Sequence, residues 1–285
     1  ADLDLNFASL ETPRRILSDV LLQATLRDGA LRLDRLRSGG LMGNFEVHGS
    51  LQPVSEQSAK LTLDVSARKL TPNRADWHQA DPATLPQFNG EARLQATGAG
   101  LRELAAGLNG RLVLTAEPGV FPGKGLGALN YSFLEQVFNT IIPGLKIREA
   151  TELKCFAADL RIEDGLLSTM PLIALQTTKL LILSSGTLNL EDERLSFGFQ
   201  ATPTRLLNAQ LTELLNPFVR IEGSLAQPTP VIDPKGTLIY GSAAAATAGL
   251  SIVAKGLWDR LRGSTRPCQR LYKSLTENPP IPSQG

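Results

Sequence analysis

The chain has 285 residues and carries 29 lysines and arginines against 28 aspartates and glutamates, so its formal net charge is +1. This balance provides none of the positive field that draws phosphate groups to nucleic-acid-binding proteins, and we expect no nucleic-acid partner. The length suffices for one large domain or two small ones. Aromatic residues make up 5% of a chain that is 42% hydrophobic, so the apolar material is mainly aliphatic.

Alternation of apolar and polar residues dominates the N-terminal region. The chain starts ADLDLNF, which is acidic and alternating, unlike the basic and then apolar start of a signal peptide. In AKLTLDVSARKL (59–70), Leu61, Leu63 and Val65 point to one side and the polar residues between them to the other. Strands of this kind bury one face and leave the other in water, as in antiparallel sheets. We therefore expect an N-terminal β repeat over residues 1–70.

A stretch rich in proline and aspartate follows at residues 71–88, and we expect it to be a loop or a domain seam. Alternation resumes beyond it, as in EARLQATG (91–98) and RLSFGFQAT (194–202), so residues 89–235 are expected to form a second β region. In all, about a dozen strands and a few short helices predict a mainly β fold with a long twisted antiparallel sheet.

Turn residues support hairpins at two places. Asp28-Gly29 and Asp164-Gly165 each lie between strand-like runs, and this dipeptide tolerates the positive φ angles of tight hairpin turns. A glycine that opens a further strand follows 21 residues after the first Asp, at Gly49, and 22 residues after the second, at Gly186. These spacings indicate a degenerate internal repeat, although hairpins recur in any β protein.

Three short helices are predicted between the strands. They cover GLRELAAGLNG (100–110), YSFLEQVFNTIIPG (131–144) and TRLLNAQLTELLN (204–216), each bounded by glycine or proline.

The C-terminal region requires a choice between a surface helix and a membrane span. Residues 236–254 carry no charge over nearly the length of a span. Much of this segment is Ala, Gly, Ser and Thr, which insert poorly into membranes, and an amphipathic stretch follows it. We expect a C-terminal helix over residues 236–268 that packs on the end of the sheet or rests at a membrane surface, with a span as the alternative. Residues 269–285 are expected to be a disordered tail.

The sequence contains no motif that indicates catalysis or cofactor binding. The glycine-rich stretch GKGLGAL (123–129) lacks the spacing of a P-loop or a dinucleotide-binding loop. His48 and His78 lie in no cluster with metal-ligand spacing. Cys155 and Cys268 fit either one disulfide or two separate buried thiols. With no acid, base and nucleophile in a recognisable arrangement, we expect no enzyme, no cofactor and no metal.

A wide sheet with one apolar face has to cover that face. It can close as a barrel, pair with a second sheet, or stay open and accept apolar cargo. The aliphatic composition suits acyl chains, but composition and periodicity by themselves favour a core filled by the protein's own side chains.

Several segments taken in order resemble the AsmA family, specifically its AsmA-like C-terminal region. The family's pattern has a Cys-bearing strand, an Asp-Gly hairpin, a Gly-led strand, an acidic turn and a strand that ends near proline. Residues 155–203 resemble this pattern, with the sequence CFAADLRIEDGLLSTMPLIALQTTKLLILSSGTLNLEDERLSFGFQATP. FNGEARLQATGAGLRELAAGLNGRLVLTAEPGVFPGKGL (88–126) and VRIEGSLAQPTPVIDP (219–234) are similar to the segments before and after it.

This resemblance implies a periplasmic protein of the Gram-negative envelope. Such proteins curl their sheet into an open, taco-like apolar groove, and the full-length protein is expected to be anchored in the inner membrane. The implied function is to bind or conduct phospholipids, or other acyl-chain lipids, between the inner and outer membranes in support of outer-membrane biogenesis. The alternative is a structural or interaction module in outer-membrane protein assembly that transports nothing.

The resemblance also implies site residues. Family members often carry a late cysteine after the terminal helix, and this implies a disulfide between Cys155 and Cys268. The residues expected to line the groove are the apolar members of the alternating strands: Leu61, Leu63, Val65, Leu94, Leu112, Leu114, Leu160, Ile162, Leu188, Leu190, Leu195, Phe197 and Phe199.

Overall fold

A computed structural model describes residues 1–11, 16–39, 43–71, 81–121, 150–204, 218–232 and 266–281. The strands, in chain order, are β1 (Asp2–Glu11), β2 (Ile16–Arg27), β3 (Ala30–Gly39), β4 (Asn44–Pro53), β5 (Ala59–Leu70), β6 (Phe88–Gly98), β7 (Asn109–Ala116), β8 (Gly119–Phe121), β9 (Thr151–Glu163), β10 (Leu166–Thr177), β11 (Leu180–Asn189), β12 (Arg194–Pro203), β13 (Phe218–Ser224) and β14 (Pro228–Ile232). The helices are α1 (Leu101–Ala106), α5 (Pro267–Glu277) and a short 3₁₀ turn, η2 (Pro82–Thr84).

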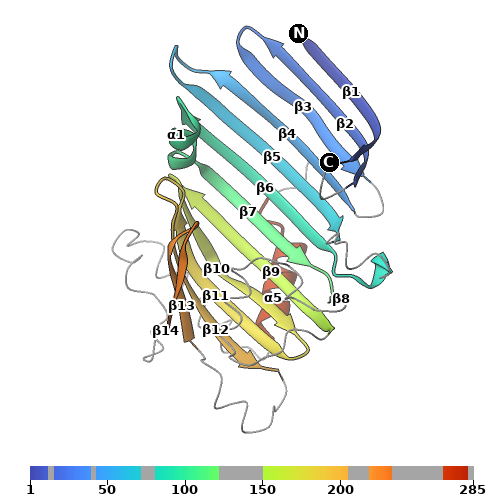
Figure 1. Cartoon of the computed structure of the whole chain (residues 1–285), viewed down its shortest axis with the longest axis vertical. Helices are drawn as coiled ribbons and strands as arrows, with labels where there is room; N and C mark the ends of the chain where they lie inside the picture. Colours follow the sequence, from blue (N-terminus) through green and yellow to red (C-terminus); the bar gives the residue numbers. More distant parts are fainter. Residues whose placement is uncertain are drawn as a thin grey trace.

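All fourteen strands of the described residues belong to one antiparallel sheet. Each strand pairs with the next one along the chain, except that β7 pairs with β9, and the short β8 pairs with β9 beside it. Figure 1 shows this uninterrupted succession from the N-terminal strands to β14. The prediction of a mainly β fold with a large antiparallel sheet and few helices is confirmed.

The sheet continues directly across the proline-rich segment. Strand β5 pairs with β6 over most of its length, with Leu63 opposite Leu94 and Val65 opposite Ala92. Residues 72–80 lie outside the described part of the chain. The β regions expected before and after this segment are therefore joined in a single sheet.

The two Asp-Gly dipeptides form tight hairpin turns, as predicted. Asp28 and Gly29 have φ angles of 51° and 75°, and Asp164 and Gly165 have φ angles of 46° and 71°. Two consecutive positive φ angles define the turn type whose twist matches that of paired strands. The turns join β2 to β3 and β9 to β10, and the two glycines expected to open a further strand, Gly49 and Gly186, lie inside β4 and β11.

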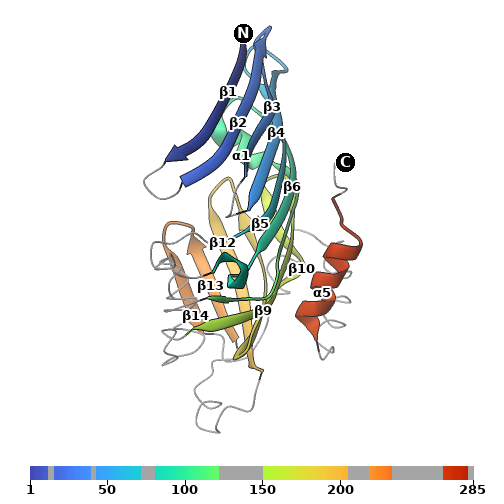
Figure 2. The same cartoon turned by 90° about the vertical axis from the view of Figure 1, so that its right-hand side faces the viewer.

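The sheet is curled, and its two sides differ. In Figure 2, α5 lies on one side of β9 and β10, and β13 and β14 lie on the other. Register shifts in β2 and β10 accompany the curl, and irregularities of this kind bend a strand and increase its twist. We call the side that points away from α5 the inner face and the side that carries α5 the outer face.

Helix α5 corrects the expected boundary of the C-terminal tail. The sequence predicts a disordered tail from residue 269 onward, but the helix runs from Pro267 to Glu277. A proline is well suited to the first turn of a helix because it has no N–H to leave unpaired. Cys268, Leu271 and Leu275 are buried on one side at helical spacing, so the tertiary contacts that stabilise this helix lie beyond the predicted end.

Of the other predicted helices, only one falls among the described residues. The glycine-bounded segment 100–110 contains α1, as expected. The predictions for residues 131–144 and 204–216, and for the uncharged segment 236–254, lie outside the described ranges. None of the described helices is long and apolar enough to cross a membrane.

Candidate functional site

Strand register determines which side chains share the inner face. Residues directly opposite each other on neighbouring strands project to the same side of a sheet. Leu61 lies opposite Leu51 on one side and Ala96 on the other. Leu112 lies opposite Leu160. Apolar rows of this kind cross the sheet from strand to strand and point away from α5.

Twelve of the thirteen predicted groove residues lie in strands, and register puts them all on this inner face. They are Leu61, Leu63, Val65, Leu94, Leu112, Leu114, Leu160, Ile162, Leu188, Leu195, Phe197 and Phe199. Leu190 follows the end of β11 and lies in the turn before β12, so register does not assign it to a face. The structure brings these residues to one face, while their contact with lipid stays a prediction.

The inner face is wider than the predicted set. Strands β1 to β3 extend it with further large aliphatic side chains and one phenylalanine. They are Leu3, Leu5, Phe7, Leu22, Leu26, Leu31, Leu33 and Leu36. The alternation in LDLNF at the start of the chain is the signal that could have identified the first of them. Val219 and Ile221 extend the face at its other end, through pairs with Phe199 and Phe197.

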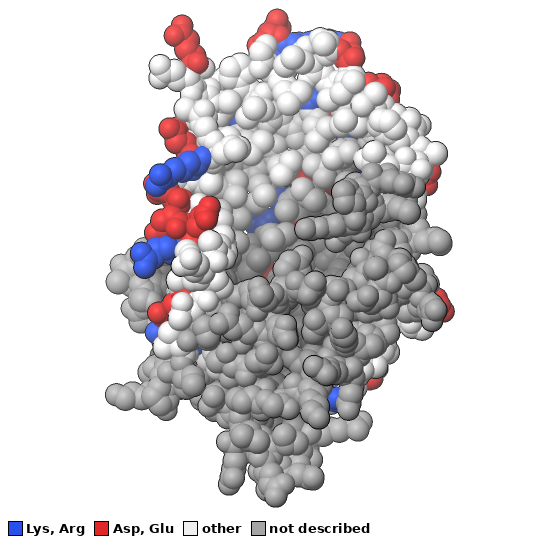
Figure 3. Space-filling view, in the orientation of Figure 1, with Lys and Arg blue, Asp and Glu red and all other residues white. Residues whose placement is uncertain are grey.

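Charged groups are largely absent from the inner face. Figure 3 looks onto this face and shows Lys, Arg, Asp and Glu gathered along its edges, with a nearly uncharged surface over the N-terminal strands. Most charged side chains of β3 to β9 lie on the outer face instead, where several of them form cross-strand ion pairs. Arg93 contacts Asp64 at 2.8 Å, and Arg35 contacts Glu46 at 2.8 Å.

One outer-face ion pair is more enclosed than the others. The guanidinium of Arg111 donates hydrogen bonds to both carboxylate oxygens of Asp159, whose side chain is 5% exposed. These hydrogen bonds raise the pKa of Arg111 above its usual value, against the opposing effect of burial. The pair bridges β7 and β9, and its acidic and basic groups are engaged with each other.

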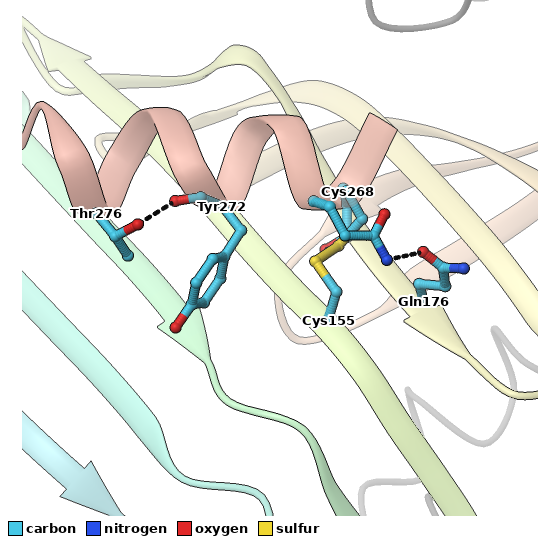
Figure 4. Close-up of a disulfide and its surroundings, with 7 residues drawn as sticks. Cys155, Gln176, Cys268, Tyr272 and Thr276 are labelled. Carbon is cyan, nitrogen blue, oxygen red and sulfur yellow. Dashed lines mark hydrogen bonds between the residues drawn. A yellow bond between two sulfur atoms is a disulfide. The ribbon is translucent and has the colours of Figure 1, made fainter. Parts of the chain in front are cut away.

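Helix α5 covers an apolar island on the outer face. Beneath it lie small and aliphatic side chains of β7, β9, β10 and β11, namely Val113, Ala157, Leu172, Ala174 and Leu183. A Cys155–Cys268 disulfide ties the first turn of the helix to β9, so the disulfide implied by the resemblance is present (Figure 4). Beside it, Gln269 Nε2 donates a hydrogen bond to Gln176 Oε1 at 2.7 Å.

The described residues offer no other chemical centre. They contain no group of three His, Cys, Asp or Glu side chains that could hold a metal ion. His48 bonds to Glu46 and to the main-chain oxygen of Asp34 on the outer face, and His78 lies outside the described part. Two cavities, of about 410 and 540 Å³, are lined mainly by polar residues of the outer face such as Arg68, which borders both.

The sequence model of the AsmA family matches residues 1–172, more than half of the chain. The match ends within β10, so much of the segment 155–203 that carried the resemblance lies beyond it. The chain is 22% identical over 266 residues to the AsmA family protein YhjG of Escherichia coli (strain K12). This alignment covers 91% of the chain, and the chain spans about 37% of that relative's length. No solved structure matches the chain.

Proposed function

The chain belongs to the AsmA family, and from this premise we propose that it binds phospholipids by their acyl chains on the inner face of its sheet. We place it in the periplasm of a Gram-negative cell, where it would carry or hold lipid between the two membranes and so support outer-membrane biogenesis. The name of the Escherichia coli relative states the family alone. The substrate, compartment and direction of transport are therefore parts of this proposal.

One observation carries the proposal, and it is the continuity of an aliphatic, uncharged surface across many strands. On β3 to β6 the inner-face positions hold Leu, Val, Phe, Ala, Gly and Pro, with Ser38 as the single polar side chain. Ser38 already donates to the main-chain oxygen of Ser18 at 2.9 Å. Such a surface offers neither charge nor hydrogen bonds to a polar ligand, whereas acyl chains require neither.

A matched pair of substitutions on β6 tests the proposal. Leu94 is half-buried on the inner face, and its sequence neighbour Gln95 is exposed on the outer face. Leu94→Glu introduces a charge where acyl chains would lie, at the cost of desolvating it, and we expect it to abolish lipid binding. Gln95→Glu adds the same charge to the same strand on the opposite side, and we expect it to leave binding unchanged.

Lipids that co-purify with each folded variant are extracted and identified by mass spectrometry, and circular dichroism checks that the sheet is retained. Loss of phospholipid from the Leu94→Glu variant, but not from the Gln95→Glu variant, supports the proposal. A wild-type protein that carries no lipid and takes none up from phosphatidylethanolamine vesicles would refute it. That result would favour the alternative of an interaction module whose apolar face is covered by protein.

A further inference from the structure

The inner face is divided into two parts of different exposure. Its apolar side chains on β1 to β6 form what we call the open half, and those on β9 to β13 form the closed half. Resting on the function proposed above, we propose that acyl chains occupy the open half only. In this view the closed half is a core filled by the protein itself, and the lipid-binding surface ends at the boundary between the two.

Exposure distinguishes the halves most directly. In the open half, Leu26 is 49% exposed and Leu31 46% exposed, and most other large side chains there are half-buried. In the closed half, Ile162 is 5% exposed and Ile221 only 1%. Both sets alternate with polar residues in the same way along their strands, so the sequence pattern of the strands does not account for the difference.

Neighbouring strands of the closed half pack their apolar side chains against one another. Buried side chains of β11, β12 and β13 form one cluster, with further apolar residues packed around it. Its buried members are Leu180, Ile182, Leu195, Ala201, Val219 and Ile221. The outer side of β9 to β11 is covered as well, by α5 and the disulfide. Strands β9 to β11 are therefore largely buried on both faces, as a core strand layer is, while Phe197 and Phe199 of β12 are half-buried.

A second cluster marks the boundary between the halves. Leu85, which follows η2, is 3% exposed, and Phe121 at the end of β8 is 2% exposed. They pack with Ala116, Phe88 and Phe156 of β7, β6 and β9. The main chain of Gly119 runs so close to Leu85 and Pro86 that an added Cβ would lie 2.3 Å from Pro86 N. The chain thus closes tightly over the inner side where β6 and β7 meet β9.

Among the described residues, neither a helix nor a buried apolar cluster covers the strands of the open half before β6. On its outer face it presents ion pairs such as Arg93–Asp64 in place of a packed helix. Within β1 to β5, Val20 is the one apolar side chain among the described residues that is buried. A single layer with one large apolar face exposes more apolar surface than soluble proteins usually leave in water. We therefore infer that an occupant completes it.

The chemistry of the open half selects acyl chains as that occupant. A protein partner would bring a mixed surface, and interfaces usually carry a polar rim and about one hydrogen bond per 100–200 Å². Across β3 to β6 the inner-face positions supply one polar side chain, Ser38, and its hydroxyl is already bonded. Flexible aliphatic chains are the ligand whose binding needs none of these groups. A second copy of this chain, stacked face to face, is the competing occupant that the test must separate.

Photocrosslinking from two phenylalanines locates the lipid. Phe45 on β4 belongs to the open half and Phe197 on β12 to the closed half, and both side chains are half-buried. Each is replaced in turn by benzoylphenylalanine, which keeps an aromatic ring at the position. The variants are incubated with vesicles that contain headgroup-labelled phosphatidylethanolamine and are then irradiated. We expect the yield of lipid adduct from position 45 to exceed that from position 197 by about tenfold, equivalent to about 1.4 kcal/mol.

The outcomes separate the two proposals. Equal yields, a higher yield from position 197, or bound lipid that reaches neither position would overturn the division into halves and leave lipid binding standing. The absence of any bound lipid would overturn the proposed function, and the division with it. Sedimentation of the delipidated protein tests whether a second copy of the chain occupies the open half. A dimer that dissociates as lipid binds agrees with the proposal. A dimer that persists and blocks the crosslink refutes it.

Discussion

Tyr272 is an ionisable side chain of α5 that packs against the sheet, so its ionisation affects the packing of this helix. Burial against the sheet raises its pKa, and the negative charge of Glu117 raises it further. Its ring projects from the helix toward the sheet, as Figure 4 shows. The charged form of tyrosine is the deprotonated one, so both causes favour the neutral side chain in the folded state.

Raising the pH should therefore weaken the folded state through Tyr272. Below the unfolded pKa of about 10 both states are neutral and the group contributes nothing to the pH dependence. Above it the unfolded chain loses the proton while the folded protein retains it, so stability falls as pH rises toward the folded pKa. Urea unfolding of the wild type and of Tyr272→Phe, compared at about pH 9 and about pH 11, measures this. An identical loss of stability in both proteins would contradict it.

Two glycines at equivalent turn positions should differ in their tolerance of alanine. Gly29 and Gly165 both have positive φ, and this alone costs a residue with a side chain about 1–2 kcal/mol. An added Cβ at Gly29 would meet only Pro53 Cγ, at 3.8 Å. At Gly165 it would lie 2.6 Å from the main-chain oxygen of Ala106 and 2.7 Å from that of Ala105.

Gly165→Ala should consequently destabilise the protein more than Gly29→Ala, because α1 must shift to admit the methyl group. The change in unfolding midpoint at constant slope in urea gives the comparison. Equal losses at both turns would show that the contact with α1 has no energetic weight.

At the scale of the elements, the disulfide should be the strongest single constraint on α5. It closes a loop with a sequence separation of 113, which in the chain-entropy model contributes about 4–5 kcal/mol to the free energy of unfolding. Both sulfur-bearing residues are nearly or fully buried, with Cys155 at 3% and Cys268 at 0% exposure. Alanine is the suitable replacement because it is small and introduces no polar group at these buried positions.

The double substitution Cys155→Ala and Cys268→Ala should lower the free energy of unfolding by up to this amount, and it should loosen α5 before the sheet unfolds. Urea unfolding followed by far-ultraviolet circular dichroism measures the first effect, and limited proteolysis near residue 266 measures the second. Ser274→Ala, on the exposed side of α5, serves as the control. Unchanged stability in the double variant would contradict the role assigned to the bond.

Local sequence predicts the strands well and the terminal helix less well. Alternation and Asp-Gly turns are local signals, and they place β5, β6 and β12 and both hairpin turns where the structure has them. Helix α5 is stabilised by contacts with residues such as Ala174, about a hundred positions away, and the local signal at its start is weak, a single proline at position 267. The predicted start of the disordered tail, residue 269, is wrong because residues 269–277 belong to this helix.

Which half of the apolar face is open could not be predicted from the sequence at all. Leu61 and Leu63 alternate with polar residues in the same way as Leu195 and Phe197 do. Alternation determines which face a side chain takes, but coverage depends on which distant segments pack above that face. The structure supplies this missing information through the curl of β11 to β13 and through the Leu85–Phe121 contact region.

The molecule as a whole combines a double-covered core with a single-layer extension, and the two should differ in local stability. Amide hydrogens in regions with few buried apolar contacts exchange through openings that cost less than global unfolding. Strands β1 to β5 contain almost no buried side chains among their described residues, whereas β9 to β11 are buried on both faces and fastened by the disulfide. The extension is held to the core through the pairing of β5 with β6 and of β6 with β7.

In delipidated protein we therefore expect amides of β1 to β5 to exchange first and as a group, and those of β9 to β11 to exchange only on global unfolding. Hydrogen exchange followed by mass spectrometry resolves these segments. Val20→Ala, which removes the one buried apolar side chain described in the extension, should speed exchange in β1 to β5 and leave β9 to β11 unaffected. Uniform protection across the sheet would mean that the fourteen strands unfold as one unit, and the apolar extension would then need no ligand to complete it.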